Sequence, residues 1–85
     1  MSDDRTLYTV EDETGVRTTI TLDKWVADIL QEYIPDVHAW VQETYNKVAM
    51  KKSHLGRRQK GDLVRALSVR EALNTPTGIS LTHDL

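Results

Sequence analysis

The side chains best suited to recognise another molecule form a polar row in residues 17–22, whose sequence is RTTITL. Because successive side chains of a β-strand point to opposite faces, an extended conformation would place Arg17, Thr19 and Thr21 on one face. An arginine can donate two hydrogen bonds to O6 and N7 of guanine, and a threonine can bond to a base edge or contact a thymine methyl group. The row therefore has the chemistry of a DNA-reading surface. An ordinary half-exposed strand is the alternative, because threonine is also a good strand former.

The opposite face of this strand and the helix that follows it would supply a core. Thr18, Ile20 and Leu22 alternate with the polar row and would point toward the interior. Asp23 comes next and is a candidate N-cap. Apolar residues then recur at helical spacing and predict a helix over residues 24–33.

Two more helices are expected further along the chain. Pro35 ends the first helix, because the residue before a proline disfavours the α conformation. Asp36 is the next candidate cap, ahead of a predicted helix over residues 37–52, for which Gly56 is a natural stop. The third helix is expected to begin near Asp62, a third candidate cap.

The predicted strand needs a partner, because one strand alone cannot satisfy its backbone hydrogen bonds. Residues 5–10 could supply it within the chain, joined by an acidic turn over residues 11–15 that ends in glycine, or they could form a loose arm. A second copy of the chain is the other source, and we expect the two-stranded ribbon to form between two subunits. Oligomerisation would also stabilise a chain of 85 residues that has no cysteine and a small core. We therefore expect an obligate homodimer. Its expected core consists of Thr18, Ile20, Leu22, Val26, Ile29, Leu30, Trp40, Val41, Tyr45 and Val48.

Charge is distributed unevenly along the chain, although the formal net charge is only −2. Residues 48–74 carry seven lysines and arginines against two acids, which gives +5. The most basic part, residues 51–61, is expected to be a connector that can contact phosphates and make binding depend on salt. A solvated connector without such a role is the alternative. From Thr75 onward the chain is expected to be frayed.

The strand, its cap and the two amphipathic helices after it resemble the ribbon-helix-helix repressors of the Arc, MetJ and CopG type over residues 16–48. The resemblance implies a mainly α homodimer with a short β-ribbon. This chain would add an extra C-terminal helix and a possible N-terminal strand. It also implies that Arg17, Thr19 and Thr21 contact bases in the major groove of double-stranded DNA.

In this family the N-terminus of the second helix holds a backbone phosphate, which corresponds to Val37 and His38 here. The family often has a glycine turn and a Ser or Thr at this point, whereas this chain has Pro35 and Asp36. A carboxylate repels a phosphate unless the side chain is occupied in capping. Further phosphate contacts are expected from Lys24, Lys51, Lys52, Arg57, Arg58 and Lys60.

One domain in three parts is expected. Residues 1–15 would be an acidic arm or an extra strand, residues 16–52 the ribbon-helix-helix core, and residues 53–85 the basic connector, third helix and frayed tail. The expected function is sequence-specific DNA binding, most simply repression at a symmetric operator. An antitoxin or protein–protein adaptor, binding a partner protein through the C-terminal helix and tail, is the alternative.

Catalysis is not expected. His38, His54 and His83 are scattered, none at a convincing metal-ligand spacing, and the chain has no glycine-rich phosphate loop or nucleophile motif. We therefore expect no catalytic residue, no metal and no cofactor. No apolar run approaches the ~20 residues of a membrane span, and the first residues have no signal-peptide pattern. A cytoplasmic protein is expected.

Overall fold

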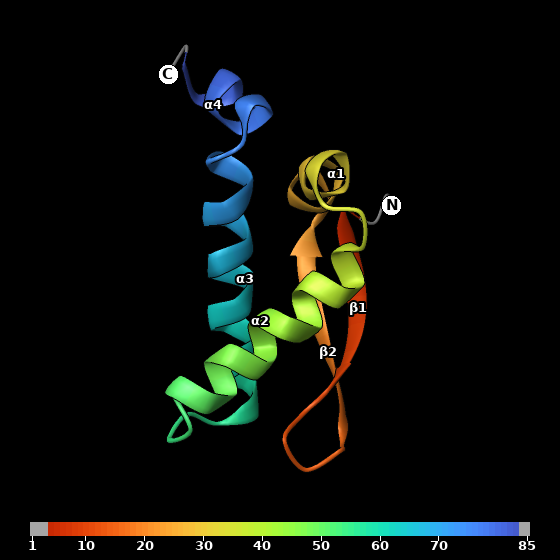
Figure 1. The fold of residues 1–85 in the computed structure, drawn as a ribbon, viewed down its shortest axis with the longest axis vertical. Helices are drawn as coiled ribbons and strands as arrows, with labels where there is room; N and C mark the ends of the chain where they lie inside the picture. Colours follow the sequence, from red (N-terminus) through yellow and green to blue (C-terminus); the bar gives the residue numbers. More distant parts are fainter. Residues whose placement is uncertain (1–3, 84–85) are drawn as a thin grey trace.

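The structure of the protein, a computed structural model, describes residues 4–83. Within that range, a two-stranded antiparallel ribbon precedes four helices. The elements are β1 (Arg5–Glu11), β2 (Arg17–Asp23), α1 (Lys24–Tyr33), α2 (Val37–Lys51), α3 (Arg57–Leu73) and α4 (Pro76–His83). Helices α1, α2 and α3 all contact the ribbon, whereas α4 sits at the far end of α3 (Figure 1). The prediction of a mainly helical fold with a short β-ribbon is confirmed.

The ribbon is a hairpin made by one chain. β1 pairs with β2 along its whole length, starting with Arg5 opposite Asp23. The turn is closed by a hydrogen bond of 2.8 Å from the Asp12 N–H to the Val16 carbonyl. Gly15 has a φ of 84° there, in the left-handed region that favours glycine. A short loop joins the strands at little entropic cost, so β1 supplies the bonds that were expected from a second subunit. The alternative in which residues 5–10 form a strand is the correct one.

The core lies between the inner face of the hairpin and the helices. Tyr8 and Val10 of β1 are buried there beside Ile20 and Leu22 of β2. Most residues expected at a dimer core are buried inside this single chain, namely Ile20, Leu22, Val26, Ile29, Leu30, Val41, Tyr45 and Val48. The other two, Thr18 and Trp40, are half-buried. These side chains therefore need no second chain to cover them.

The first two helices have nearly the predicted bounds. α1 matches the prediction, and α2 ends one residue early, at Lys51. Asp36 caps α2 as expected, since its carboxylate accepts a hydrogen bond of 3.0 Å from Ala39 N–H. Asp23 holds the N-cap position of α1 without a capping bond. Its carboxylate instead pairs with Arg65 at 3.0 Å, because α3 brings a guanidinium to the end of β2.

The prediction for the start of α3 was wrong. This helix begins at Arg57, so Asp62 lies inside it and half of the expected connector is helical. The side-chain oxygen of Gln59 accepts a hydrogen bond of 2.9 Å from Gly56 N–H. A donor at the helix start is thereby satisfied by a residue three positions on, as in a capping box. Gly56 therefore starts α3 rather than only ending α2.

The chain after Thr75 was expected to be frayed, but it forms α4. The Thr75 hydroxyl accepts from Gly78 N–H at 3.1 Å, which caps the helix. A Cβ on Gly78 would lie only 2.0 Å from the Ala72 carbonyl oxygen, so glycine permits the close contact with α3. The Tyr33 hydroxyl lies 2.7 Å from Thr77 Oγ1 and ties α4 to α1.

Candidate nucleic-acid interface

The predicted polar row lies on the outer face of the ribbon. Arg17 and Thr19 are exposed and Thr21 is half-buried, whereas Ile20 and Leu22 between them are buried. The alternation along β2 therefore has the two faces expected from the sequence. The helices pack against the inner face, which leaves the polar row on the surface.

β1 adds side chains to this outer face that were not among the predicted site residues. The facing pairs are Leu7 with Thr21, Thr9 with Thr19, and Glu11 with Arg17. Leu7 is 62% exposed, which is unusual for a leucine in the middle of a strand. The alternation of polar and apolar residues in RTLYTVE is the pattern that could have predicted a two-faced strand here. A single chain thus presents a complete two-stranded ribbon, which is narrow enough for the major groove.

A basic groove runs along the side of the ribbon between β2 and α3. It encloses a cavity of about 220 Å³. Its charged lining residues are Arg5, Arg57, Arg58, Arg65 and Asp62. Thr19 and Thr21 of the polar row line the same cavity, so the structure brings predicted base-contacting and phosphate-contacting residues together. Arg5 and Arg65 were not predicted, because only the tertiary fold places them beside β2.

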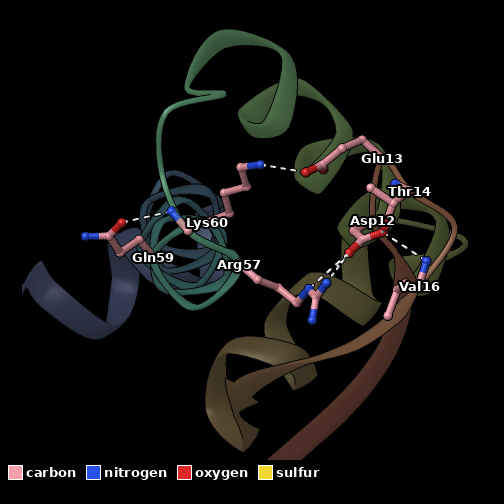
Figure 2. Close-up of polar contacts among 8 residues, drawn as sticks. Asp12, Glu13, Thr14, Val16, Arg57, Gln59 and Lys60 are labelled. Atoms are coloured by element: carbon pink, nitrogen blue, oxygen red, sulfur yellow. Dashed lines mark hydrogen bonds and ion pairs between the residues drawn. The ribbon is translucent and has the colours of Figure 1, made fainter.

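An ion pair holds the hairpin turn against the start of α3, as Figure 2 shows. Arg57 Nη2 lies 2.9 Å from Asp12 Oδ2. The other carboxylate oxygen accepts from the Thr14 hydroxyl at 2.6 Å and from the N–H groups of Thr14 and Val16 at 2.9 Å. The hydrogen bond from the Thr14 hydroxyl is the main cause that lowers the pKa of Asp12 from 3.8 to about 2, with help from Arg57. We call this Asp12–Arg57 contact the turn latch.

A second ion pair at the turn involves Lys60, one of the residues predicted to contact phosphates. Lys60 is only 4% exposed, and its ammonium lies 2.8 Å from Glu13 Oε1 (Figure 2). The same hydrogen bond lowers the pKa of Glu13. Because the Lys60 ammonium is buried and already paired with a carboxylate, it is poorly placed to contact a phosphate. By contrast, Arg58 forms no ion pair within residues 4–83 and is the most available cation of the basic groove.

We expect the Asp12 carboxylate, through its hydrogen bonds in the turn and its ion pair with Arg57, to make the free energy of unfolding fall in acid. Its contribution is fully present above the ordinary pKa of 3.8 and is lost as the pH falls through about 2. Asp12→Asn should therefore be less stable at neutral pH and should show a flatter pH dependence between those values. Urea unfolding at a series of pH values measures both effects.

Asp28→Asn is the matched control for the turn latch. Asp28 forms an exposed pair with Lys24 at 3.4 Å, so its removal should change little at any pH. If Asp12→Asn and the unmodified protein lose stability in parallel below pH 3.8, the latch is not the acid-sensitive group.

Side chains of α2 lie along the outer edge of β1. Gln42 exchanges two hydrogen bonds with the backbone of Glu11, at 2.9 and 3.0 Å. His38 Nε2 contacts the Thr9 carbonyl oxygen, and its ring stacks on Tyr8 with centroids 6.2 Å apart. Because a carbonyl only accepts hydrogen bonds, Nε2 has to carry a proton in this contact.

The structure separates the other predicted phosphate contacts. Val37 is buried at the start of α2, where the carboxylate beside it is occupied in capping. Lys24 pairs with Asp28 at the start of α1. Lys51 and Lys52 line a different groove, between α2 and α3, which shares no residue with the basic groove.

Comparisons with known proteins add no identification. No protein-family model matches the chain, no curated protein matches its sequence, and no solved structure matches its fold. Residues 4–83 contain no cluster of His, Asp or Glu side chains that could hold a metal ion. In the same part of the chain no helix combines the length and apolarity needed to cross a bilayer.

Proposed function

We propose that this protein is a sequence-specific DNA-binding transcriptional regulator of ribbon-helix-helix type, most simply a repressor. The observation that supports it is the outer face of the ribbon, where Arg17, Thr19 and Thr21 lie in one row while the helices cover the other face. A two-stranded ribbon of this width enters a major groove with its outer face toward the bases.

Each part of the surface has a role in this proposal. Arg17 donates to a guanine, and Thr19 and Thr21 bond to base edges or contact thymine methyl groups. Arg58, at the side of the ribbon, contacts a phosphate of the strand that flanks the groove. Base contacts of this kind select the sequence, whereas phosphate contacts set the position of the protein on the duplex.

A homodimer remains part of the proposal, although it no longer has to complete the ribbon. One ribbon reaches only a few base pairs. Two ribbons related by two-fold symmetry would read two half-sites about one helical turn apart, which predicts a symmetric operator. Such a regulator would act in the cytoplasm on double-stranded DNA, without a cofactor.

Two experiments test this function. One selects bound sites from a random duplex library, and the other measures electrophoretic mobility shifts at low and high salt. We expect binding at low salt that weakens steeply as salt rises, and enrichment of a two-fold symmetric sequence. Absence of binding at low salt would contradict DNA binding altogether. Binding without enrichment would contradict sequence reading, and an enriched site without symmetry would contradict the dimer.

The alternative function, an antitoxin or protein–protein adaptor, has less support than it had from the sequence. This alternative assigned partner binding to the C-terminal helix and tail, and the tail after Thr75 is not loose but forms α4, which packs against α3.

A further inference from the structure

The backbone of the ribbon has two outer edges, and the hydrogen-bond pattern shows which residues face them. In an antiparallel pair, residues that bond to the partner strand alternate with residues whose N–H and C=O groups point outward. The Asp12 N–H bonds to the Val16 carbonyl, and the Lys24 N–H bonds to the Asp4 carbonyl. With the observed register, the even-numbered residues therefore bond across the ribbon. The odd-numbered residues of both strands point their backbone groups outward.

The outer edge of β1 is closed by α2. Gln42 accepts from the Glu11 N–H and donates to the Glu11 carbonyl, the two bonds that a neighbouring strand would make. His38 occupies the Thr9 carbonyl on the same edge. An edge whose backbone groups are occupied is protected from pairing with another strand.

The outer edge of β2 has no such closure. Within residues 4–83, no hydrogen bond reaches the outward N–H and C=O groups of Arg17, Thr19 and Thr21. Thr19 and Thr21 line the basic groove. α3 supports β2 from the inner face, where a Cβ on Gly61 would lie 3.3 Å from Ile20 Cδ1. The edge itself therefore stays open, beside a row of arginines.

We propose that the outer edge of β2 binds an extended acidic segment of a partner protein as a third strand. Hydrogen-bond donors (N–H) and acceptors (C=O) alternate along this edge, and a second polypeptide backbone supplies the complementary acceptors and donors. A nucleic-acid phosphate supplies acceptors alone, so it would leave the carbonyls of Thr19 and Thr21 unpaired. The groove favours acidic side chains, because Arg58 lines it without an ion pair in residues 4–83, while Arg57 and Arg65 beside it each have a single carboxylate partner. This proposal does not depend on DNA binding.

The same charges disfavour a second copy of the chain on this edge. Two-fold pairing of β2 with β2 would bring the Arg58 side chains of both copies to one seam, and Arg58 forms no ion pair within residues 4–83. Like charges facing each other across a strand pair are destabilising. An acidic strand meets these arginines with opposite charge.

Amide hydrogen exchange, followed by nuclear magnetic resonance, tests the proposal. The probe is a blocked eight-residue peptide of four Glu-Val repeats, and a Lys-Val peptide of equal length is its control. We expect the Glu-Val peptide to slow exchange at Arg17, Thr19 and Thr21, with no change at Thr9 or Glu11. The Lys-Val peptide should protect none of them.

A pair of proline variants separates the two edges. Thr19→Pro removes an outward donor without removing a bond to β1, and proline is tolerated on an edge strand with its nitrogen outward. We expect it to weaken Glu-Val binding by about tenfold, the loss of one good hydrogen bond. Thr9→Pro, at the facing position on the closed edge, is the matched control and should keep the affinity. Circular dichroism checks that both variants fold.

Arg58→Ala, which leaves the ribbon backbone intact, should weaken binding of the Glu-Val peptide about two- to fivefold.

Four results would overturn the proposal. The first is no protection by the Glu-Val peptide at millimolar concentration. The second is equal binding by the Thr19→Pro and Thr9→Pro variants. The third is protection of the same amides by concentrating the protein alone, which would assign the edge to a second copy. The fourth is protection by a short DNA duplex in place of the peptide, which would assign it to nucleic acid.

Discussion

Leu22→Ala should destabilise the protein by about 2–5 kcal/mol, because it removes a side chain from a filled core and leaves a cavity. Leu22 is completely buried on the inner face of the ribbon. Small domains have total stabilities of about 5–15 kcal/mol. The variant should therefore lose a large share of its stability, which a lower urea midpoint and melting temperature would show.

Leu7→Ala is the matched control, with the same substitution on the other face of the same ribbon. Leu7 is 62% exposed, so its truncation should change stability by no more than about 0.5 kcal/mol. Equal losses at the two positions would contradict the assignment of inner and outer faces. A large loss at Leu7 that depends on protein concentration would mean that a second chain covers the outer face.

Arg17→Ala should weaken binding to the selected DNA site by about 1–3 kcal/mol, or about 5- to 150-fold, if Arg17 reads a guanine. The reason is that two hydrogen bonds to one base edge are lost together. Binding to random duplex should change far less, because that binding depends on phosphates. Titration of both duplexes at one salt concentration measures the two losses.

Two further arginines serve as controls for Arg17. Arg58→Ala should weaken binding to the selected and random duplexes alike, and should reduce the salt dependence, as expected for a phosphate contact. Arg70→Ala alters a residue beside Trp40, on the opposite side of α3 from the basic groove, and should affect neither duplex. Equal losses on both duplexes for Arg17→Ala would count against base reading.

Local sequence patterns predicted the elements whose ends are marked by local chemistry. Pro35 and the cap at Asp36 separate α1 from α2, and both helices begin where predicted. The alternation in residues 17–22 predicted the two faces of β2. These features depend on backbone stereochemistry and side-chain periodicity, which act over a few residues.

The two wrong predictions, the start of α3 and the frayed end of the chain, concern features that depend on contacts between residues distant in sequence. The start of α3 depends on the Gln59 cap and on Arg57 and Lys60, whose carboxylate partners lie 45 and 47 residues earlier in the hairpin turn. α4 depends on Gly78, whose missing side chain allows close contact with Ala72. No local pattern shows that these groups will meet.

The sequence by itself determined that Arg17, Thr19 and Thr21 share one face of a strand, because alternation is a property of the strand alone. Only the tertiary structure decided what lies around that face. It paired β2 with β1 of the same chain, closed the edge of β1 with α2 and left the edge of β2 open beside the arginines of α3. The physical reason is that edge closure and charge clustering arise from side chains that are distant in sequence and become neighbours only when the helices pack.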